Sequence, residues 1–425
     1  MIQTGLIQSA HDDLVTDLSY DFYGLRLATC SLDQRIKVWQ LDETNGTWSV
    51  EDEWKAHDAA VSKLSWAHPE FGTVLASASF DRTVKVWEQT SFTPATENYP
   101  NGATTTQLTG SGSSSRWVER AVLIDARGTV RAVEFAPHHF GLKLATISSD
   151  NHLRIYECLE RWQLSEEVDV TTLPAASSPS SYSVAFATPT QTSATLEGAS
   201  ASLVAQALQQ SQAPFQARPG VGNREADGGW CISWCKERYW GEVIVAGSGI
   251  SGTIKIIQIS PSRRPTTLLT LDPSPSGTAR STDASSSGNV PSGEGDAPTP
   301  YAITAVAWAP SCGRSYHLIA TGGRDGHVRI WRVKPAEDSD DMDGEGGEPK
   351  WTGTIVADFD HHKSAIGRVE WNITGTVLSS AGNDGRVRLW KATIGNVWRP
   401  AGSIGVEQAE DSPDADANMD DAVAD

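Results

Sequence analysis

Three groups of residues in this 425-residue chain have types and spacings that could support chemistry. The glycines of GSGISG (247–252) match a G-x-G-x-x-G pattern, which holds a dinucleotide pyrophosphate when a helix begins directly after it. Here the apolar run TIKIIQI follows, which is typical of a strand, so we interpret the glycines as a turn. Cys231 and Cys235 have no second pair at zinc-ligand spacing, and we expect packed thiols. We predict no cofactor and no metal.

Acidic and histidine residues recur once per unit, which argues against acid–base catalysis because an active site needs one constellation. An Asp stands in five tight turns, at Asp33, Asp81, Asp150, Asp325 and Asp384. Such a carboxylate can accept hydrogen bonds from backbone N–H groups and from a His side chain. The candidate partners are His11, His57 and either His361 or His362. Without a nucleophile–base pair or a phosphate loop, we predict a binding scaffold with no small-molecule substrate, and no enzyme.

The elements that carry these turns are six copies of one four-stranded unit. Each copy begins with a strand closed by an aromatic residue and continues with small residues, as in LASAS (75–79). After the Asp turn, a third strand reaches an aromatic residue six positions later, at Trp39, Trp87, Tyr156, Trp331 and Trp390. The fourth copy keeps this spacing with Ser251 and Ile257. With a variable fourth strand in each unit, the pattern predicts an all-β fold, a WD-repeat β-propeller of six blades.

The units lie near 11–56, 57–126, 127–170, 229–272, 301–360 and 361–406, and we predict one propeller domain over residues 1–406. Polar inserts are expected at 91–115, 171–228, 273–299 and 335–349, and a disordered acidic tail at 407–425. Acids in 337–348 and in this tail carry most of the net charge of −19. The sequence has no apolar run of about 18 residues, so we expect a soluble protein.

A basic residue also recurs two positions before the closing residue of the third strand, at Lys37, Lys85, Arg154, Lys255, Arg329 and Arg388. One interpretation is a positive ring for nucleic acid. We favour another: the side chain shares a face with the closing residue, so its stem covers the ring while its charge reaches water or the turn Asp. We predict no direct contact with nucleic acid.

The N-terminal run is a surplus strand. If NVWRPAGSIGV (396–406) is the outer strand of the last unit, six units supply twenty-four strands and leave an open ring with unpaired edges. We predict that a partner donates three strands to a seventh blade by β-augmentation. They would join the run Ile2, Gln3, Thr4, Gly5, Leu6, Ile7 and Gln8. The alternative is that 396–406 is not a strand and the ring closes at six blades.

Four longer phrases resemble one family. They are WAHPEFGTVLASASFDRTVKVWE (66–88), WVERAVLIDARGTVRAVEFAPHHFGLKLATISSDNHLRIYE (117–157), HLIATGGRDGHVRIW (317–331) and VEWNITGTVLSSAGNDGRVRLWKA (369–392). They resemble the Seh-type nucleoporins, WD-repeat subunits of the Y complex in the nuclear pore scaffold. A sister family, the Sec-type vesicle-coat propellers, shares AHPEFG and WN but does not usually carry the text of 117–127.

The resemblance implies an open six-bladed ring that an α-helical-solenoid nucleoporin completes with a seventh blade, at Ile2–Gln8 of this chain. It implies a non-enzymatic structural scaffold at the nuclear envelope that supports transport of mRNA and protein, with only indirect membrane contact. It also implies a coat-like complex in amino-acid signalling at the vacuolar membrane. The inserts and the acidic tail depart from the family pattern. Two alternatives stay open: a vesicle-coat propeller, and a closed propeller that binds peptides as an adaptor.

Overall fold

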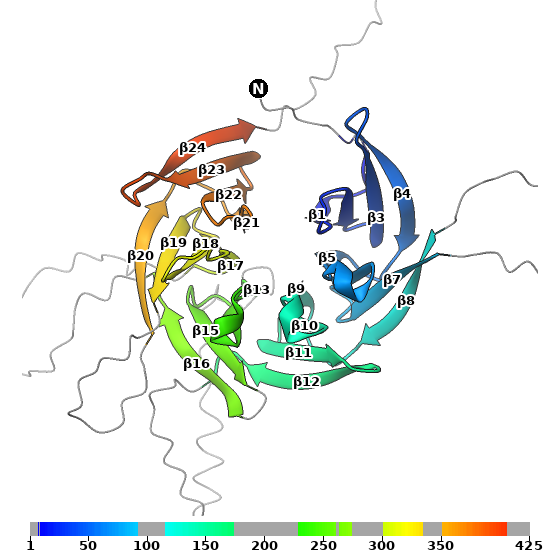
Figure 1. Cartoon of the computed structure of the whole chain (residues 1–425), viewed down its shortest axis with the longest axis horizontal. Coiled ribbons are helices and arrows are strands. Elements are labelled where there is room, and N and C mark those ends of the chain that lie inside the picture. The colour runs from blue at the N-terminus through cyan, green and yellow to red at the C-terminus, as the bar shows by residue number, and fades with distance from the viewer. Residues whose placement is uncertain are drawn as a thin grey trace, which may run out of the picture.

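The structure is a computed structural model that describes residues 7, 9–91, 115–173, 228–260, 263–273, 301–334 and 351–405. These residues form six antiparallel sheets of four strands each, arranged as blades around a central axis (Figure 1). In every blade the four strands follow one another in chain order from the axis outward. The fold is an all-β propeller with six blades, as the repeat predicts.

The strands of the first three blades have the following bounds. Blade 1 contains β1 (Val15–Tyr20), β2 (Arg26–Ser31), β3 (Arg35–Asp42) and β4 (Thr47–Lys55). Blade 2 contains β5 (Val61–Trp66), β6 (Val74–Ser79), β7 (Val84–Ser91) and β8 (Ser115–Leu123). Blade 3 contains β9 (Val130–Phe135), β10 (Lys143–Ser148), β11 (His152–Cys158) and β12 (Trp162–Asp169). β7 and β8 each take one residue from the insert predicted at 91–115.

The other three blades repeat this order. Blade 4 contains β13 (Cys231–Trp234), β14 (Glu242–Gly247), β15 (Ile254–Ser260) and β16 (Arg263–Leu271). Blade 5 contains β17 (Ile303–Trp308), β18 (His317–Gly323), β19 (Val328–Lys334) and β20 (Thr352–Phe359). Blade 6 contains β21 (Ile366–Trp371), β22 (Val377–Gly382), β23 (Arg386–Ala392) and β24 (Trp398–Gly405).

Short 3-10 helices join the first two strands of blades 2, 3 and 4, at η1 (Pro69–Phe71), η2 (His138–Phe140) and η3 (Arg238–Trp240). Each ends at a glycine with positive φ, a backbone conformation that residues with a Cβ atom rarely adopt. These glycines are Gly72, Gly141 and Gly241. The glycines therefore allow the chain to turn sharply from the helix into the second strand.

The two ends of the chain decide how the ring closes. β24 lies within the run 396–406 and pairs along β23, with Trp398 opposite Ala392 and Gly405 opposite Arg386. Blade 6 thus has four strands of its own, and the alternative in which this run is not a strand is wrong. The surplus strand predicted at Ile2–Gln8 lies outside the described residues, apart from Ile7, which is not assigned to a strand.

A network of side chains ties the strands of a blade together. In blade 1 the Trp39 indole donates to Thr29 Oγ1 over 2.9 Å, while His11 contacts the same hydroxyl at 2.9 Å and the Asp33 carboxylate at 2.8 Å. Blades 2 and 6 repeat this arrangement with His57, Asp81, Ser77 and Trp87, and with His362, Asp384, Ser380 and Trp390. Of the two candidate histidines of the last unit, His362 makes these contacts.

The acid of the network stays ionised even though it is partly buried. At Asp384, burial raises the pKa, but hydrogen bonds from His362 and Arg388 outweigh this and lower the pKa to about 2. A carboxylate with so low a pKa keeps its charge, and therefore its capacity to accept hydrogen bonds, at neutral pH.

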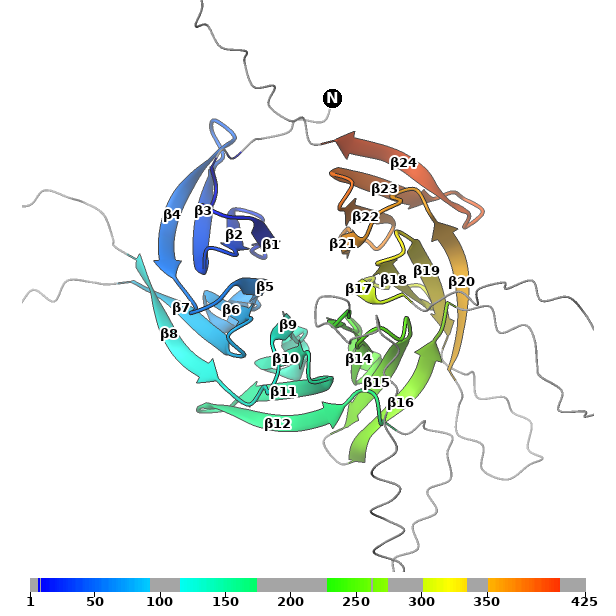
Figure 2. The ribbon, with the colours of Figure 1, turned by 180° about the vertical axis from the view of Figure 1, so that it is seen from behind.

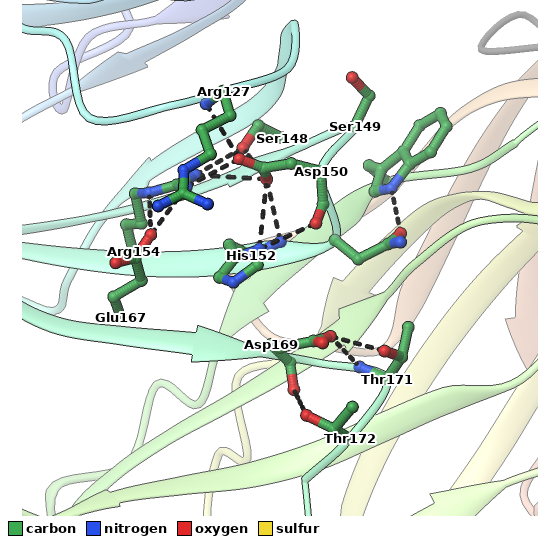
Figure 3. A network of polar contacts seen from close by, with 12 residues as sticks. Arg127, Ser148, Ser149, Asp150, His152, Arg154, Glu167, Asp169, Thr171 and Thr172 are labelled. Carbon is green, nitrogen blue, oxygen red and sulfur yellow. Dashed lines mark hydrogen bonds and ion pairs between the residues drawn. The ribbon is translucent and has the colours of Figure 1, made fainter. Parts of the chain in front are cut away.

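Blades 3 and 5 use an arginine in the place of the histidine, and Figure 3 shows the arrangement in blade 3. The fully buried Arg154 donates to Asp150 over 2.7 Å and pairs with Glu167 at 2.8 Å, and Arg329 pairs with Asp325 at 2.7 Å. Burial raises the pKa of Asp150, but hydrogen bonds to its carboxylate, the strongest of them from Arg154, outweigh this effect. The pKa of Asp150 therefore lies well below its usual range. In these blades the recurrent basic residue therefore serves the turn Asp, one of its two predicted roles.

Apolar clusters fill five junctions between neighbouring blades, from blades 1 and 2 through blades 5 and 6. Small residues in the second strands let the sheets approach closely, and they are completely buried at Ala28, Ala76, Ala145 and Ala320. Within the described ranges no such cluster joins blade 6 to blade 1. Figures 1 and 2 show an opening at this place, between β23 and β24 on one side and β3 and β4 on the other.

Candidate docking site at the ring opening

The first wall of the opening belongs to blade 1. A bulge between Val15 and Asp17 and the strand alternation that follows place Val15, Leu18 and Tyr20 on one face of β1. These side chains are 46%, 42% and 53% exposed. In β5 the matching Val61 and Leu64 are 0% and 4% exposed, because blade 1 covers them. The wall of blade 1 thus carries the same types of apolar residue as a closed junction, but no neighbouring blade of the described chain covers them.

The second wall belongs to blade 6 and shows the same difference. Four residues of β22 and β23 face the opening and are only partly buried, at Ser379, Ala381, Val387 and Leu389. The residues at the same positions of blade 5 are buried against blade 6, at Ala320, Gly322, Val328 and Ile330. Val387 and Leu389 at the opening, like Val328 and Ile330 at the closed junction, are large apolar side chains of types that are usually buried.

Exposed apolar side chains gather on the two blades that flank the opening. Of the seventeen large apolar or aromatic side chains that are exposed among the described residues, ten lie on blades 1 and 6 and their adjoining loops. They are Leu14, Val15, Leu18, Tyr20, Phe22, Tyr23, Val50, Ile373, Ile394 and Val397. Large contiguous apolar patches mark interaction surfaces in general, whereas single exposed apolar residues are ordinary.

The closing tryptophan of blade 1, Trp39, is 5% exposed, as buried as the closing tryptophans of blades 2 and 5. In blades 2 and 6 an aromatic side chain from the outer strand of the preceding blade packs on the closing residue. Trp54 lies 5.5 Å from Trp87, and Phe359 stacks on Trp390 at 4.0 Å. Among the described residues neither Trp39 nor Trp331, which lies at the closed junction between blades 4 and 5, has such an aromatic partner. A seventh blade would be the preceding blade for Trp39.

The predicted site residues fall in two places. Of the proposed completion strand, Ile2–Gln8, only Ile7 is described, so the structure leaves its pairing open. The predicted turn and closing residues hold their own blades together, and only those of blade 1 stand at the opening. Sequence reasoning missed the two walls because their residues look like ordinary strand core. The available signal was that they belong to the first and last units of an open ring.

The recurrent lysines do not form a ring of free positive charge. Lys37 pairs with Glu53 at 3.2 Å, and Lys85 pairs with Glu119 at 2.9 Å. Lys255 donates to a backbone oxygen over 3.0 Å. Because these charges are already engaged, the propeller offers them poorly to a phosphate backbone.

The other candidates for chemistry are structural. Cys231 and Cys235 are buried free thiols packed in the core, and this burial raises the pKa of each to about 12. Of the GSGISG glycines, Gly247 ends β14, and Gly249 and Gly252 lie in the turn before β15. The described ranges contain no group of three or more His, Cys, Asp or Glu side chains that could hold a metal. They also contain no helix with the length and apolar character needed to cross a membrane.

Comparison with known proteins adds a sequence relationship to this geometry. The family model "WD domain, G-beta repeat" matches residues 4–40, 48–88, 295–332 and 353–391. The chain is 30% identical to Nucleoporin SEH1 of Saccharomyces cerevisiae over 94% of this chain and 99% of that protein. It is 34% identical to Nucleoporin SEH1-A of Xenopus laevis, over 96% and 89%, and to Nucleoporin SEH1 of Homo sapiens, over 94% and 87%.

Proposed function

The chain belongs to the family of SEH1 nucleoporins, and from this premise we propose that it is a non-enzymatic structural subunit of the Y complex in the nuclear pore scaffold. As a nucleoporin it resides in the nuclear pore complex at the nuclear envelope. The similarity spans nearly the whole chain, so it includes both blades that flank the opening.

We propose that the chain binds an α-helical-solenoid nucleoporin by accepting a seventh blade from it. The partner would supply three extended strands, and Ile2–Gln8 would supply the fourth. One observation carries this proposal: positions buried at closed junctions are exposed at the opening, as in the pair Leu64 and Leu18. A sheet placed there would cover both walls and would bring an outer strand close to Trp39.

Such docking combines two sources of affinity. Main-chain pairing with the surplus strand fixes the register of the donated strands. Burial of the two apolar walls adds the hydrophobic term, which is about 25 cal/mol for each Å² of apolar surface removed from water. An interface of this type belongs to the large obligate class of about 2,000 Å² or more.

The proposal extends to the wider role of the family. As part of the Y complex, the chain would support nucleocytoplasmic transport of mRNA and protein. In a second coat-like assembly, at the vacuolar membrane, it would contribute to amino-acid signalling. The names of the relatives favour the pore over the vesicle-coat alternative. The opening favours blade acceptance over a closed peptide adaptor.

Capture of partners by the tagged full chain from its own cells tests the proposal. The Leu18→Asp variant places a charge on the blade 1 wall, and the matched control Leu159→Asp changes a 73% exposed leucine on blade 3. Wild type and the control should retain an α-solenoid nucleoporin, identified by mass spectrometry, and Leu18→Asp should lose it. Equal recovery by all three chains would overturn docking at the opening.

A further inference from the structure

One side chain ties the two sides of the opening together at the central axis. Arg368 on β21 donates through Nη1 to the Asp17 carboxylate on β1 and, over 2.6 Å, to the backbone oxygen of Leu18. Arg368 and Asp17 are 351 positions apart in the chain. Among the described residues, no apolar cluster accompanies this contact. The guanidinium therefore crosses the space between the innermost strands of blades 6 and 1.

The charges occupy one equivalent position in three successive blades. Asp17 pairs with Cys30, Lys63 with Ala78 and Arg368 with Ala381, each at the corresponding register of its first and second strands. In blades 3 and 5 the same position holds Ala132 and Ala305. At this position an acid on blade 1 thus stands between bases on blades 2 and 6, whereas blades 3 and 5 carry a small apolar residue.

Both partners keep other contacts when they separate. The Asp17 side chain is 2% exposed, but it also pairs with Lys63 at 3.0 Å and accepts from the Leu64 backbone N–H at 3.0 Å. Arg368 also contacts Glu370 through Nε at 3.0 Å. Removing one partner of a buried ion pair is costly when it leaves the other charge without compensation. Here both Asp17 and Arg368 keep an oppositely charged partner, so the contact between them can break without leaving an uncompensated buried charge.

We propose that Arg368 is a positioning residue, a latch that sets the width of the opening in the partner-free chain and yields its place when the inner strand of a donated blade enters. The second half of this proposal rests on the proposed function. The first half concerns the chain alone, and it is tested without a partner.

Pulsed electron spin resonance between two spin labels measures the width of the opening. Ser49 on β4 and Ser403 on β24 are exposed and lie on the outer strands that flank the opening. Both would be changed to Cys in a full chain that carries Cys158→Ser and Cys312→Ser. The partner-free chain should give one narrow distance distribution, and adding Arg368→Ala should give a broader distribution with a longer mean distance. An unchanged distribution would overturn the latch.

Two further variants separate the latch from general damage. Arg386→Ala removes an exposed arginine from β23 of the same blade, and it should leave the distance unchanged. Arg368→Lys keeps the charge but has no planar fork for Asp17 and the Leu18 oxygen together, so an intermediate distribution is expected. If Arg368→Ala fails to fold, Arg368→Lys decides the question, because a distribution equal to that of wild type would contradict the latch.

The same labels in the assembly captured through the tagged chain test the second half. There the distance should no longer depend on Arg368, because the donated strand occupies the place of the guanidinium. A dependence as strong as in the free chain would show that the latch does not yield. Failure of the docking proposal itself would appear separately, as retention of the partner by Leu18→Asp.

Discussion

Leu18 and Leu64 form a natural matched pair for measuring the openness of the ring. They occupy the same position of β1 and β5, and their opposite residues, Thr29 and Ser77, also correspond. Only their surroundings differ, since Leu18 is 42% exposed and Leu64 is 4% exposed. Changing each leucine to alanine in the partner-free chain therefore compares an open junction with a closed one.

The expected costs follow from burial. Leu→Ala removes three carbon groups, worth about 2.4 kcal/mol of transfer free energy at about 0.8 kcal/mol each. For Leu64→Ala this term applies almost fully and a cavity term is added, so a loss of about 3 kcal/mol of unfolding free energy is expected. For Leu18→Ala a little more than half of the transfer term applies and no closed cavity forms, which gives about 1.4 kcal/mol.

Urea unfolding of the two full-length variants, followed by tryptophan fluorescence, measures this difference. The midpoint of Leu64→Ala should fall about twice as far as that of Leu18→Ala. In the assembly with a donated blade, Leu18→Ala should become as costly as Leu64→Ala. Equal losses in the partner-free chain would refute the reasoning, because they would mean that the ring already covers Leu18.

Three further predictions concern the scaffold. Burial lowers the pKa of His317 to about 4, so as the pH falls the imidazole is protonated in the unfolded chain before it is protonated in the folded one. The free energy of unfolding should therefore be full above about pH 6.5 and about 2 kcal/mol lower at pH 5, and His317→Phe should remove this loss in urea titrations at the two pH values. Arg154→Met should cost about 3 kcal/mol in the same assay, because Asp150 loses its main partner; an unchanged midpoint would contradict the account of blade 3. In the native chain a thiol reagent should modify the exposed Cys312 within minutes and leave the buried Cys231 unmodified until urea is added; equal rates would contradict the burial.

Much of the propeller can be predicted from the sequence because its strands repeat a local pattern. The spacing from Asp81 to Trp87 and the small residues of 75–79 carry the information for a blade within about twenty residues. Choosing between His361 and His362 was not possible in this way, since both precede the same strand. The structure assigns the contacts with Asp384 to His362, and the ring of His361 packs on Trp390 instead.

The candidate site was less predictable, because burial at a junction depends on the neighbouring blade and not on the local sequence. Val15 and Leu18 follow the same spacing as Val61 and Leu64, and only ring closure distinguishes them. The Arg368 contact joins residues from the two ends of the repeat array, so no single unit contains its signal. The pairing of Ile2–Gln8 stays a prediction.

Photo-crosslinking from Tyr20 tests the central claim most directly. Tyr20 is 53% exposed on the blade 1 wall, and it can be replaced by benzoylphenylalanine in the full chain expressed in its own cells. The account predicts a crosslink to an extended segment of an α-solenoid nucleoporin, mapped by mass spectrometry. Crosslinks only to residues 396–406 of the same chain would show that blade 6 closes directly on blade 1, and they would contradict the account.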